Sequence, residues 1–308
     1  MTFGERIRGK WGNWRPQTTF SRRRSSVADI SRSLASRSLR RWGVAGASLG
    51  ALVSLLAFLP AALLAGVVGG LTNQRLQLAD ARGTVWSGSA VAVLTGGRSN
   101  RDASRLPGRL HWEWGWTGDG RSDPKSAAYA NAGSALELRV RHACCLNGVV
   151  RLLLRPGSLT LLPAGDRVGQ WPAAWLRGLG APWNTFRLDG TVRVTSDGLT
   201  VATTQRSGRL RGRITAELLD VSSPLSPLPI IGSYRLTLEP NPTVPGATSL
   251  TLTTEEGALS VSGAGTWDAA GVHFRGEASA AEDDEEALGN LLNIIGPREG
   301  ARSVISIG

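Results

Sequence analysis

A stretch of 33 residues without a charged side chain, from Trp42 to Gln74, constrains this chain more than any other feature of its sequence. About 20 apolar residues, at about 1.5 Å each, cross a hydrocarbon core, and only a helix satisfies its own backbone there. We therefore expect a transmembrane helix over 42–60 that ends or kinks near Pro60. An apolar juxtamembrane helix over 61–80 should follow. The expected membrane-anchoring side chains are Trp42, Leu52, Leu55, Leu56 and Phe58.

The positive charge of the chain is concentrated before this stretch. Residues 1–41 carry eleven Lys and Arg against two acidic residues, so they hold nine of the eleven net charges of the chain. Such a Ser- and Arg-rich arm has too little apolar surface to fold, and we expect it to be disordered. Basic residues before a span stay in the cytoplasm. A membrane anchor with basic residues before it is sufficient to explain the basic composition of the chain. We therefore do not expect the chain to bind nucleic acid.

The apolar stretch has two other interpretations, a cleavable signal peptide and a lipoprotein signal. The arm and the stretch are both long for a secretory signal, so an uncleaved anchor is favoured. The lipoprotein interpretation fails because Val67 stands where the lipid-accepting Cys would follow Leu64, Ala65 and Gly66. The chain is thus predicted to be a single-pass inner-membrane protein with most of its residues in the periplasm.

Residues 81–308 predict a mainly β, extended antiparallel domain with one or two short helices. Period-two alternation and β-branched residues, broken by Asn-Gly and Asp-Gly pairs, are typical of consecutive antiparallel strands. Helical patterns occur near 172–178 and over 281–295, where acidic residues open the second helix. The expected strands are 84–94, 109–116, 135–141, 149–154, 185–194, 199–204, 209–219, 233–238, 249–254, 258–267, 272–278 and 303–307.

No residue pattern points to an enzyme or to a bound cofactor. The three histidines, His111, His142 and His273, are far apart, and no hydrolase, metalloprotease or nucleotide-binding motif occurs. His142 lies close to Cys144 and Cys145, but two adjacent cysteines make a poor ligand set for one metal ion. In an oxidising compartment these two cysteines could bond to each other, or remain free or pair with a partner. The sequence leaves those alternatives open.

Three tryptophans share one face of an expected strand. Trp112, Trp114 and Trp116 alternate over 109–116, so one face of that strand is aromatic. Packing against the core is the favoured explanation, and an apolar binding face for a peptide or lipid is the alternative.

Four stretches together resemble the type II secretion system protein N family. They are LPAALLAGVVGGLTNQRLQLADARGTVWSGSA, ACCLNGVVRL, LPAGDRVGQWPAAWLRGLGAPWNTFRLDGTVRV and LLNIIGPREGARSVISIG. The most specific parts are the box over 83–88 and the block WLRGLGAPWNT over 175–185. The resemblance implies an accessory inner-membrane component of the type II secretion machine, with no catalytic residues to carry over.

Two functions are therefore expected from the sequence. The first is protein binding in the periplasm, to inner-membrane or outer-membrane-channel components of the type II secretion system, during export of folded proteins. The alternative is a membrane-anchored β-groove protein that binds or transfers lipid. An open apolar face would favour the lipid function, and a closed core with polar concavities would favour the secretion function.

Overall fold

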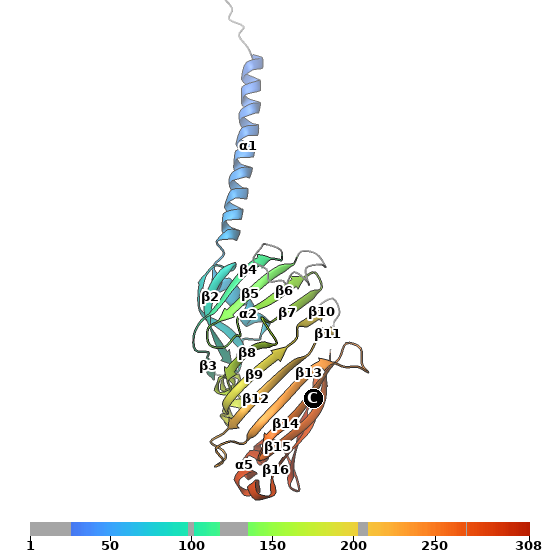
Figure 1. Cartoon of the computed structure of the whole chain (residues 1–308). Helices are drawn as coiled ribbons and strands as arrows, with labels where there is room; N and C mark the ends of the chain where they lie inside the picture. Colours follow the sequence, from blue (N-terminus) through green and yellow to red (C-terminus); the bar gives the residue numbers. More distant parts are fainter. Residues whose placement is uncertain (1–25, 98–101, 118–134, 203–208, 269) are drawn as a thin grey trace, which may run out of the picture. The chain divides into compact units, whose positions relative to one another are not determined.

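The computed structural model describes residues 26–97, 102–117, 135–202, 209–268 and 270–308. The chain divides into two compact units, Met1–Leu56 and Ala57–Gly308. Helix α1 (Ser26–Ala57) accounts for the described part of the first unit, and the second unit is mainly β, as predicted (Figure 1). None of the helices in the described part of the chain has both the length and the hydrophobicity that a membrane crossing needs. The transmembrane helix expected over 42–60 is therefore not confirmed.

Helix α1 begins earlier than the sequence suggested. Residues 26–41, expected to be disordered with the rest of the arm, form its first half, and residues 1–25 lie outside the described residues. Helix propagation adds one hydrogen bond for each residue fixed, so an apolar helix extends readily into a flank that contains Ala, Leu and Arg. The helix ends three residues before Pro60. This end is expected, because a proline disfavours the helical conformation in the residue that precedes it.

The apolar helix expected over 61–80 is shorter than predicted. Helix α2 (Ala61–Leu71) ends at Thr72, and Asn73 and Gln74 have left-handed backbone conformations. Strand β1 (Leu76–Gly83) then replaces the rest of the expected helix. Strand β1 pairs with β2 along its length. Contacts with this neighbouring strand make these residues extended, although their local composition predicted a helix.

The first sheet, called sheet 1, has nine strands, and every neighbouring pair in it is antiparallel. Its strands run in the order β1-β2-β4-β5-β6-β7-β10-β11, with β3 also paired to β2. The strands are β1, β2 (Ser87–Thr95), β3 (Ala103–Arg105), β4 (Leu110–Trp116), β5 (Leu136–His142), β6 (Val149–Arg155), β7 (Ser158–Leu162), β10 (Leu199–Ala202) and β11 (Arg209–Arg211).

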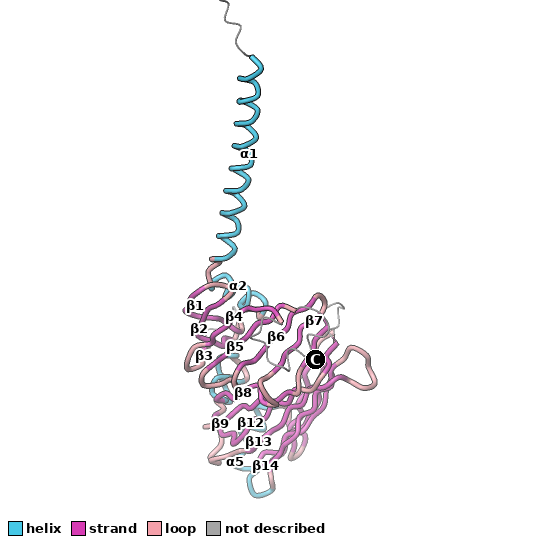
Figure 2. Tube along the Cα trace, turned by 45° about the horizontal axis from the view of Figure 1, so that its top comes forward, coloured by secondary structure: helices cyan, strands magenta, loops and turns pink. Residues whose placement is uncertain are grey.

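The second sheet, called sheet 2, also has nine strands, and every neighbouring pair in it is antiparallel. Figure 2 shows its strands β8, β9, β12, β13 and β14 next to one another. Its order is β17-β18-β16-β15-β14-β13-β12-β9-β8. The strands are β8 (Arg167–Pro172), β9 (Asp189–Ser196), β12 (Ile214–Ser222), β13 (Gly232–Pro240), β14 (Thr248–Gly257), β15 (Leu259–Trp267), β16 (Val272–Ala280), β17 (Arg298–Glu299) and β18 (Arg302–Ile307).

Several strand boundaries differ from the expected ones. The single strand expected over 209–219 is two strands, because β11 completes sheet 1 and β12 pairs within sheet 2. The start of the strand expected over 185–194 is helical, and β9 begins only at Asp189. The strand expected over 199–204 ends at Ala202, and its last two positions lie outside the described residues. Strands β1, β3, β7, β8 and β17 were not predicted.

Short helices connect and cover the sheets. The helix expected near 172–178 is a 3-10 helix, η1 (Ala173–Leu179), and is followed by α4 (Trp183–Phe186). The helix expected over 281–295 consists of η2 (Glu282–Asp284) and α5 (Glu285–Ile295). Leu288, Leu291 and Leu292 of α5 are buried against sheet 2 in the largest hydrophobic cluster of the described residues.

Candidate functional site

The strand with three tryptophans is buried at one end and open at the other. Trp112 is 3% exposed and packs under α2 with Ala61 and Ala90, and its indole N–H donates to the carbonyl oxygen of Val85 over 3.0 Å. Trp114 is half-buried at the same cluster, whereas Trp116 is 61% exposed. The packing explanation thus fits Trp112, and the binding-face alternative stays a prediction for the exposed end.

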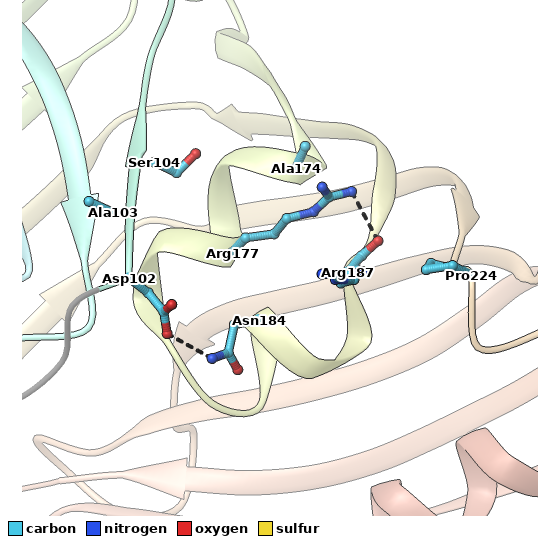
Figure 3. A pocket seen from close by; sticks show the side chains of 8 residues that line it. All are labelled: Asp102, Ala103, Ser104, Ala174, Arg177, Asn184, Arg187 and Pro224. Atoms are coloured by element: carbon cyan, nitrogen blue, oxygen red, sulfur yellow. Dashed lines mark hydrogen bonds between the residues drawn. The ribbon is translucent and has the colours of Figure 1, made fainter.

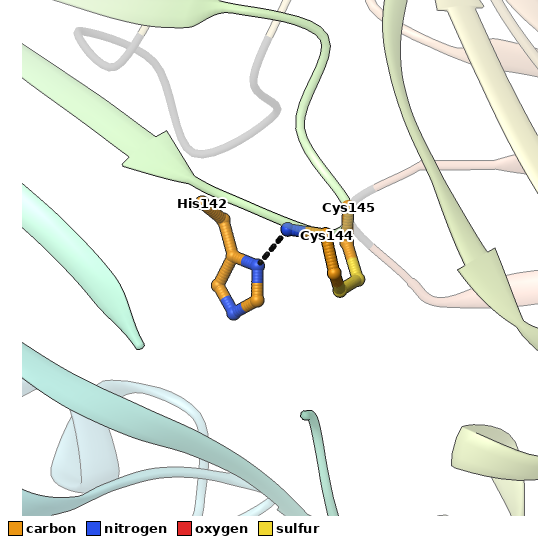
Figure 4. Close-up of a disulfide and its surroundings, with 3 residues drawn as sticks. All are labelled: His142, Cys144 and Cys145. Atoms are coloured by element: carbon orange, nitrogen blue, oxygen red, sulfur yellow. Dashed lines mark hydrogen bonds between the residues drawn. A yellow bond between two sulfur atoms is a disulfide. The ribbon is translucent and has the colours of Figure 1, made fainter. Parts of the chain in front are cut away.

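The two cysteines lie in the loop over 143–148 between β5 and β6, called here the disulfide loop (Figure 4). Their sulfur atoms are bonded to each other. The backbone N–H of Cys144 donates to Nδ1 of His142 over 3.4 Å. Burial of His142, together with the nearby His111, holds the pKa of the imidazole below its ordinary value. The donor atoms of His142, Cys144 and Cys145 lie within 4.8 Å of one another, but sulfur binds metal as a thiolate and the disulfide form offers none.

The disulfide loop continues sheet 2 at the edge strand β8. The carbonyl oxygen of Cys145 accepts a hydrogen bond from the N–H of Gln170 over 2.9 Å, and the N–H of Asn147 donates to the carbonyl of Val168 over 3.1 Å. Gly169 lies between these two bonds, where an added Cβ would overlap the Cys145 carbonyl oxygen. The loop therefore joins sheet 1 to sheet 2 and also covers part of an unpaired sheet edge.

The block over 175–185 forms another contact, between sheet 1 and the segment that links β8 to β9 of sheet 2. The indole N–H of Trp175 on η1 donates to the carbonyl oxygen of Ser104 on β3 over 3.1 Å. Gly178 lies so close to β2 and β3 that a Cβ would overlap the carbonyl oxygen of Leu94. The block thus presses a turn of helix onto sheet 1 immediately before the chain enters β9 of sheet 2.

An open pocket of about 510 Å³ lies at this junction and is called here the junction pocket (Figure 3). The side-chain amide of Asn184 donates to Oδ2 of Asp102 over 2.7 Å. Nη2 of Arg177 donates to the carbonyl of Arg187 over 3.1 Å and to Oδ1 of Asp189 over 2.9 Å. The pocket is lined by Asp102, Ala103, Ser104, Ala174, Arg177, Asn184, Arg187 and Pro224.

The charge that the junction pocket offers to a partner comes mainly from Arg187. Its backbone is left-handed, with φ of 48°, and its exposed guanidinium has no hydrogen-bond or ion-pair partner among the described residues. A guanidinium binds carboxylates in a two-point fork. The pocket is thus suited to a carboxylate or another polar acceptor on a partner molecule.

None of these pocket residues was among the predicted site residues. The block over 175–185 is one of the motifs that carry the family resemblance, but Asp102 is 82 residues away from its partner Asn184 in the sequence. Only the motif itself pointed to this region, and it gave no indication of a pocket.

Two antiparallel sheets joined around a polar pocket define a mainly β protein with a candidate binding site at the junction. Residues 74–307 match the family described as type II secretion system (T2SS), protein N. Because the match covers most of the chain, the chain belongs to this family, and the predicted resemblance is confirmed. Membership indicates a component of the type II secretion system located in the cell envelope. Comparisons with curated proteins and with solved structures found no match.

Proposed function

We propose that the chain is an accessory component of the type II secretion system that acts by binding other components of that system in the periplasm. Family membership supports a place in the secretion machinery. The observation that supports binding is the junction pocket, which presents the unpaired guanidinium of Arg187 beside the polar side chains of Asp102 and Asn184. Inner-membrane or outer-membrane-channel components that carry exposed carboxylates are the proposed partners.

We further propose that residues 42–60 anchor the chain in the inner membrane, with residues 1–41 in the cytoplasm. The uncharged stretch and the basic residues before it support this topology. The side chains of Trp42, Leu52, Leu55, Leu56 and Phe58 are all exposed, between 47% and 78%, which suits contact with lipid. A reporter enzyme that is active only in the periplasm tests the topology. Fused after Gly308 it should be active, and activity of the same reporter at the N-terminus instead would contradict the proposal.

The binding proposal is tested by charge reversal in the junction pocket. Cells expressing the full chain with Arg187→Glu would be treated with a crosslinker, and secretion components recovered with the chain would be quantified. Arg298→Glu is the matched control because Arg298 is also exposed and lies on β17, outside the pocket. We expect Arg187→Glu to reduce recovery and Arg298→Glu to leave it unchanged. Equal recovery with both variants would contradict a binding role for the pocket.

A further inference from the structure

Much of one face of sheet 1 consists of hydrocarbon and tryptophan side chains, and polar residues on the same face, such as His142 and Ser104, lie away from its centre. Across its strands, directly paired residues form two adjacent rows, called here the sheet 1 rows. Neither row contains a polar side chain that could form hydrogen bonds, apart from the indole N–H groups. The first row is Trp114, Leu138, Leu152, Leu161 and Leu199, and the second is Trp116, Leu136, Leu154, Leu159, Val201 and Leu210.

The sheet 1 rows are more exposed than several polar residues at the centre of the opposite face of the same strands. Every residue in the rows is half-buried or exposed, and Leu159 is 36% exposed. On the opposite face Glu137 is 0% exposed, Arg139 7% and Thr160 3%. A water-soluble sheet normally buries its apolar face and exposes its polar one. The opposite face is not wholly polar, because Leu153 and Leu162 are buried there as well. An apolar face that stays more exposed than charged side chains behind it is nevertheless suited to contact something other than water.

Sheet 2 repeats the apolar face over β9, β12, β13 and β14. Its paired rows, called here the sheet 2 rows, are Val194, Ala216, Leu236 and Leu252, and then Ile214, Leu238 and Leu250. All seven residues are only half-buried, although α5 packs against Leu252. The opposite face of these strands carries ion pairs, including Arg235 to Glu217 at 3.0 Å. The rows themselves are apolar, and polar side chains on the same face, such as Ser196 beside Ile214 and Thr254 beside Tyr234, lie next to the rows and not in them.

The apolar faces of the two sheets meet. Trp171 of β8 pairs with Val192 on the apolar face of sheet 2, and it packs in one cluster with Leu76 and Ala92 from the apolar face of sheet 1. Because the same cluster contains Cys145, the junction of the sheets also connects their apolar faces. The two faces that carry the sheet 1 rows and the sheet 2 rows are therefore in contact at the junction, and together they are called here the apolar surface.

We propose that this apolar surface binds the acyl chains of a membrane lipid. Backbone groups of the central strands are already paired in the sheets, so a bound peptide or nucleic acid would find almost no hydrogen-bond partners there, whereas an acyl chain needs none. Burial of an acyl chain on this face is favourable because it removes hydrocarbon from water. A six-strand row is about 24 Å long at about 4.8 Å between strands. A row of that length is long enough for an acyl chain that spans one leaflet. One leaflet is about half of a hydrocarbon core about 30 Å thick.

Two properties of the chain point to a membrane of the cell envelope as the source of such a lipid. The family belongs to the envelope secretion machinery, and the uncharged stretch from Trp42 to Gln74 leads directly into the β unit. A protein partner is a less suitable occupant, because even the core of a protein interface contains polar groups that these rows cannot satisfy. The inference does not depend on the junction pocket and goes beyond the proposed protein binding.

The test places a photoreactive benzoylphenylalanine in the full chain in intact cells whose phospholipids carry a radioactive label. Leu161 samples the sheet 1 rows and Leu250 the sheet 2 rows, whereas Thr251 is the control, since it is next to Leu250 and exposed on the opposite face. Labelled lipid should be attached to the chain at Leu161 and Leu250 and absent at Thr251. Protein adducts in place of lipid at Leu161 and Leu250, adducts between two copies of the chain, or equal lipid at all three positions would overturn the proposal.

A second measurement guards against misfolding caused by the photoreactive group. Lipid copurified with the full chain would be quantified by mass spectrometry for Leu250→Arg and for Thr251→Arg, with resistance to proteolysis confirming that both variants fold. The charged side chain on the apolar face should cause loss of copurified lipid, and the same side chain on the polar face should not. Equal lipid content in two protease-resistant variants would overturn the proposal.

Discussion

The carbonyl oxygen of Cys145 accepts a hydrogen bond from the backbone N–H of Gln170 over 2.9 Å, and this bond joins the disulfide loop of sheet 1 to the edge strand of sheet 2. Together with the hydrogen bond from Asn147 to Val168 and the packing of Trp175 on β3, it holds the two sheets at their junction. The junction pocket and the contact between the apolar faces of the two sheets both lie at this junction.

The close approach at Gly169 predicts a destabilising effect of a single methyl group. In Gly169→Ala the new Cβ would overlap the Cys145 carbonyl oxygen, so the loop or β8 must shift. We expect the free energy of unfolding to fall by about 1–3 kcal/mol, the usual range for overpacking. Gly165→Ala is the control, since nothing lies within 4 Å of the position of its Cβ, and it should change stability little. Chemical denaturation measures both, and equal effects would contradict a tight junction.

The buried carboxylate of Glu137 predicts a large loss when it is removed. Glu137 is within 3.2 Å of both Arg139 and Arg151, and all three side chains are almost inaccessible to water. Glu137→Ala leaves buried guanidinium groups without their carboxylate and should lower the free energy of unfolding by about 3–5 kcal/mol. In contrast, Glu277→Ala breaks the exposed pair with Arg302 and should lower it by about 0–1 kcal/mol. Similar urea midpoints for the two variants would refute the distinction.

The lowered pKa of His142 predicts that the protein loses stability in mild acid. Burial keeps the folded imidazole neutral, so its pKa is below the ordinary value of 6.5 that applies after unfolding. The unfolded chain then binds the proton at higher pH than the folded chain does, and stability falls as the pH drops below about 6.5. Denaturation midpoints measured between neutral and mildly acidic pH should show this decrease. His142→Gln should reduce it and His273→Gln, at an exposed site, should not.

The packing of α5 predicts different effects at neighbouring positions of one helix. Leu292 is 0% exposed in the cluster with Tyr234 and Leu259, and Ile294 is 41% exposed. Leu292→Ala should lower the free energy of unfolding by about 2–5 kcal/mol because it leaves a cavity. Ile294→Ala should lower it by much less. Thermal melting of the two variants checks this, and a larger effect at Ile294 would show that α5 packs through another face.

The sequence predicted the antiparallel β class because the signals for it are local. Strands β15 and β16 alternate clearly and pair with each other across a short turn, so periodicity and turn residues were sufficient to find them. Strand β8 was missed because Gly169 and Pro172 are poor strand residues. Its conformation is fixed by pairing with β9 and with the disulfide loop, partners that no local pattern reveals.

The candidate site was less accessible to prediction than the fold. The alternation of Trp112, Trp114 and Trp116 predicted a shared face, but only the structure showed that α2 covers Trp112 and leaves Trp116 exposed. The junction pocket brings Asp102 next to Asn184 across 82 positions. Asp102 and Asn184 are brought together by the packing of η1 and α4 on sheet 1. Neither the spacing of the residues nor the composition of the sequence predicts this contact.

The most direct test of the proposed secretion role is the distribution of exported proteins between the periplasm and the medium after deletion of this chain. The account predicts that folded exoproteins accumulate in the periplasm, that Arg187→Glu reproduces this retention, and that Arg298→Glu restores normal export. Exoproteins that reach the medium equally well with and without the chain would contradict a role in type II secretion.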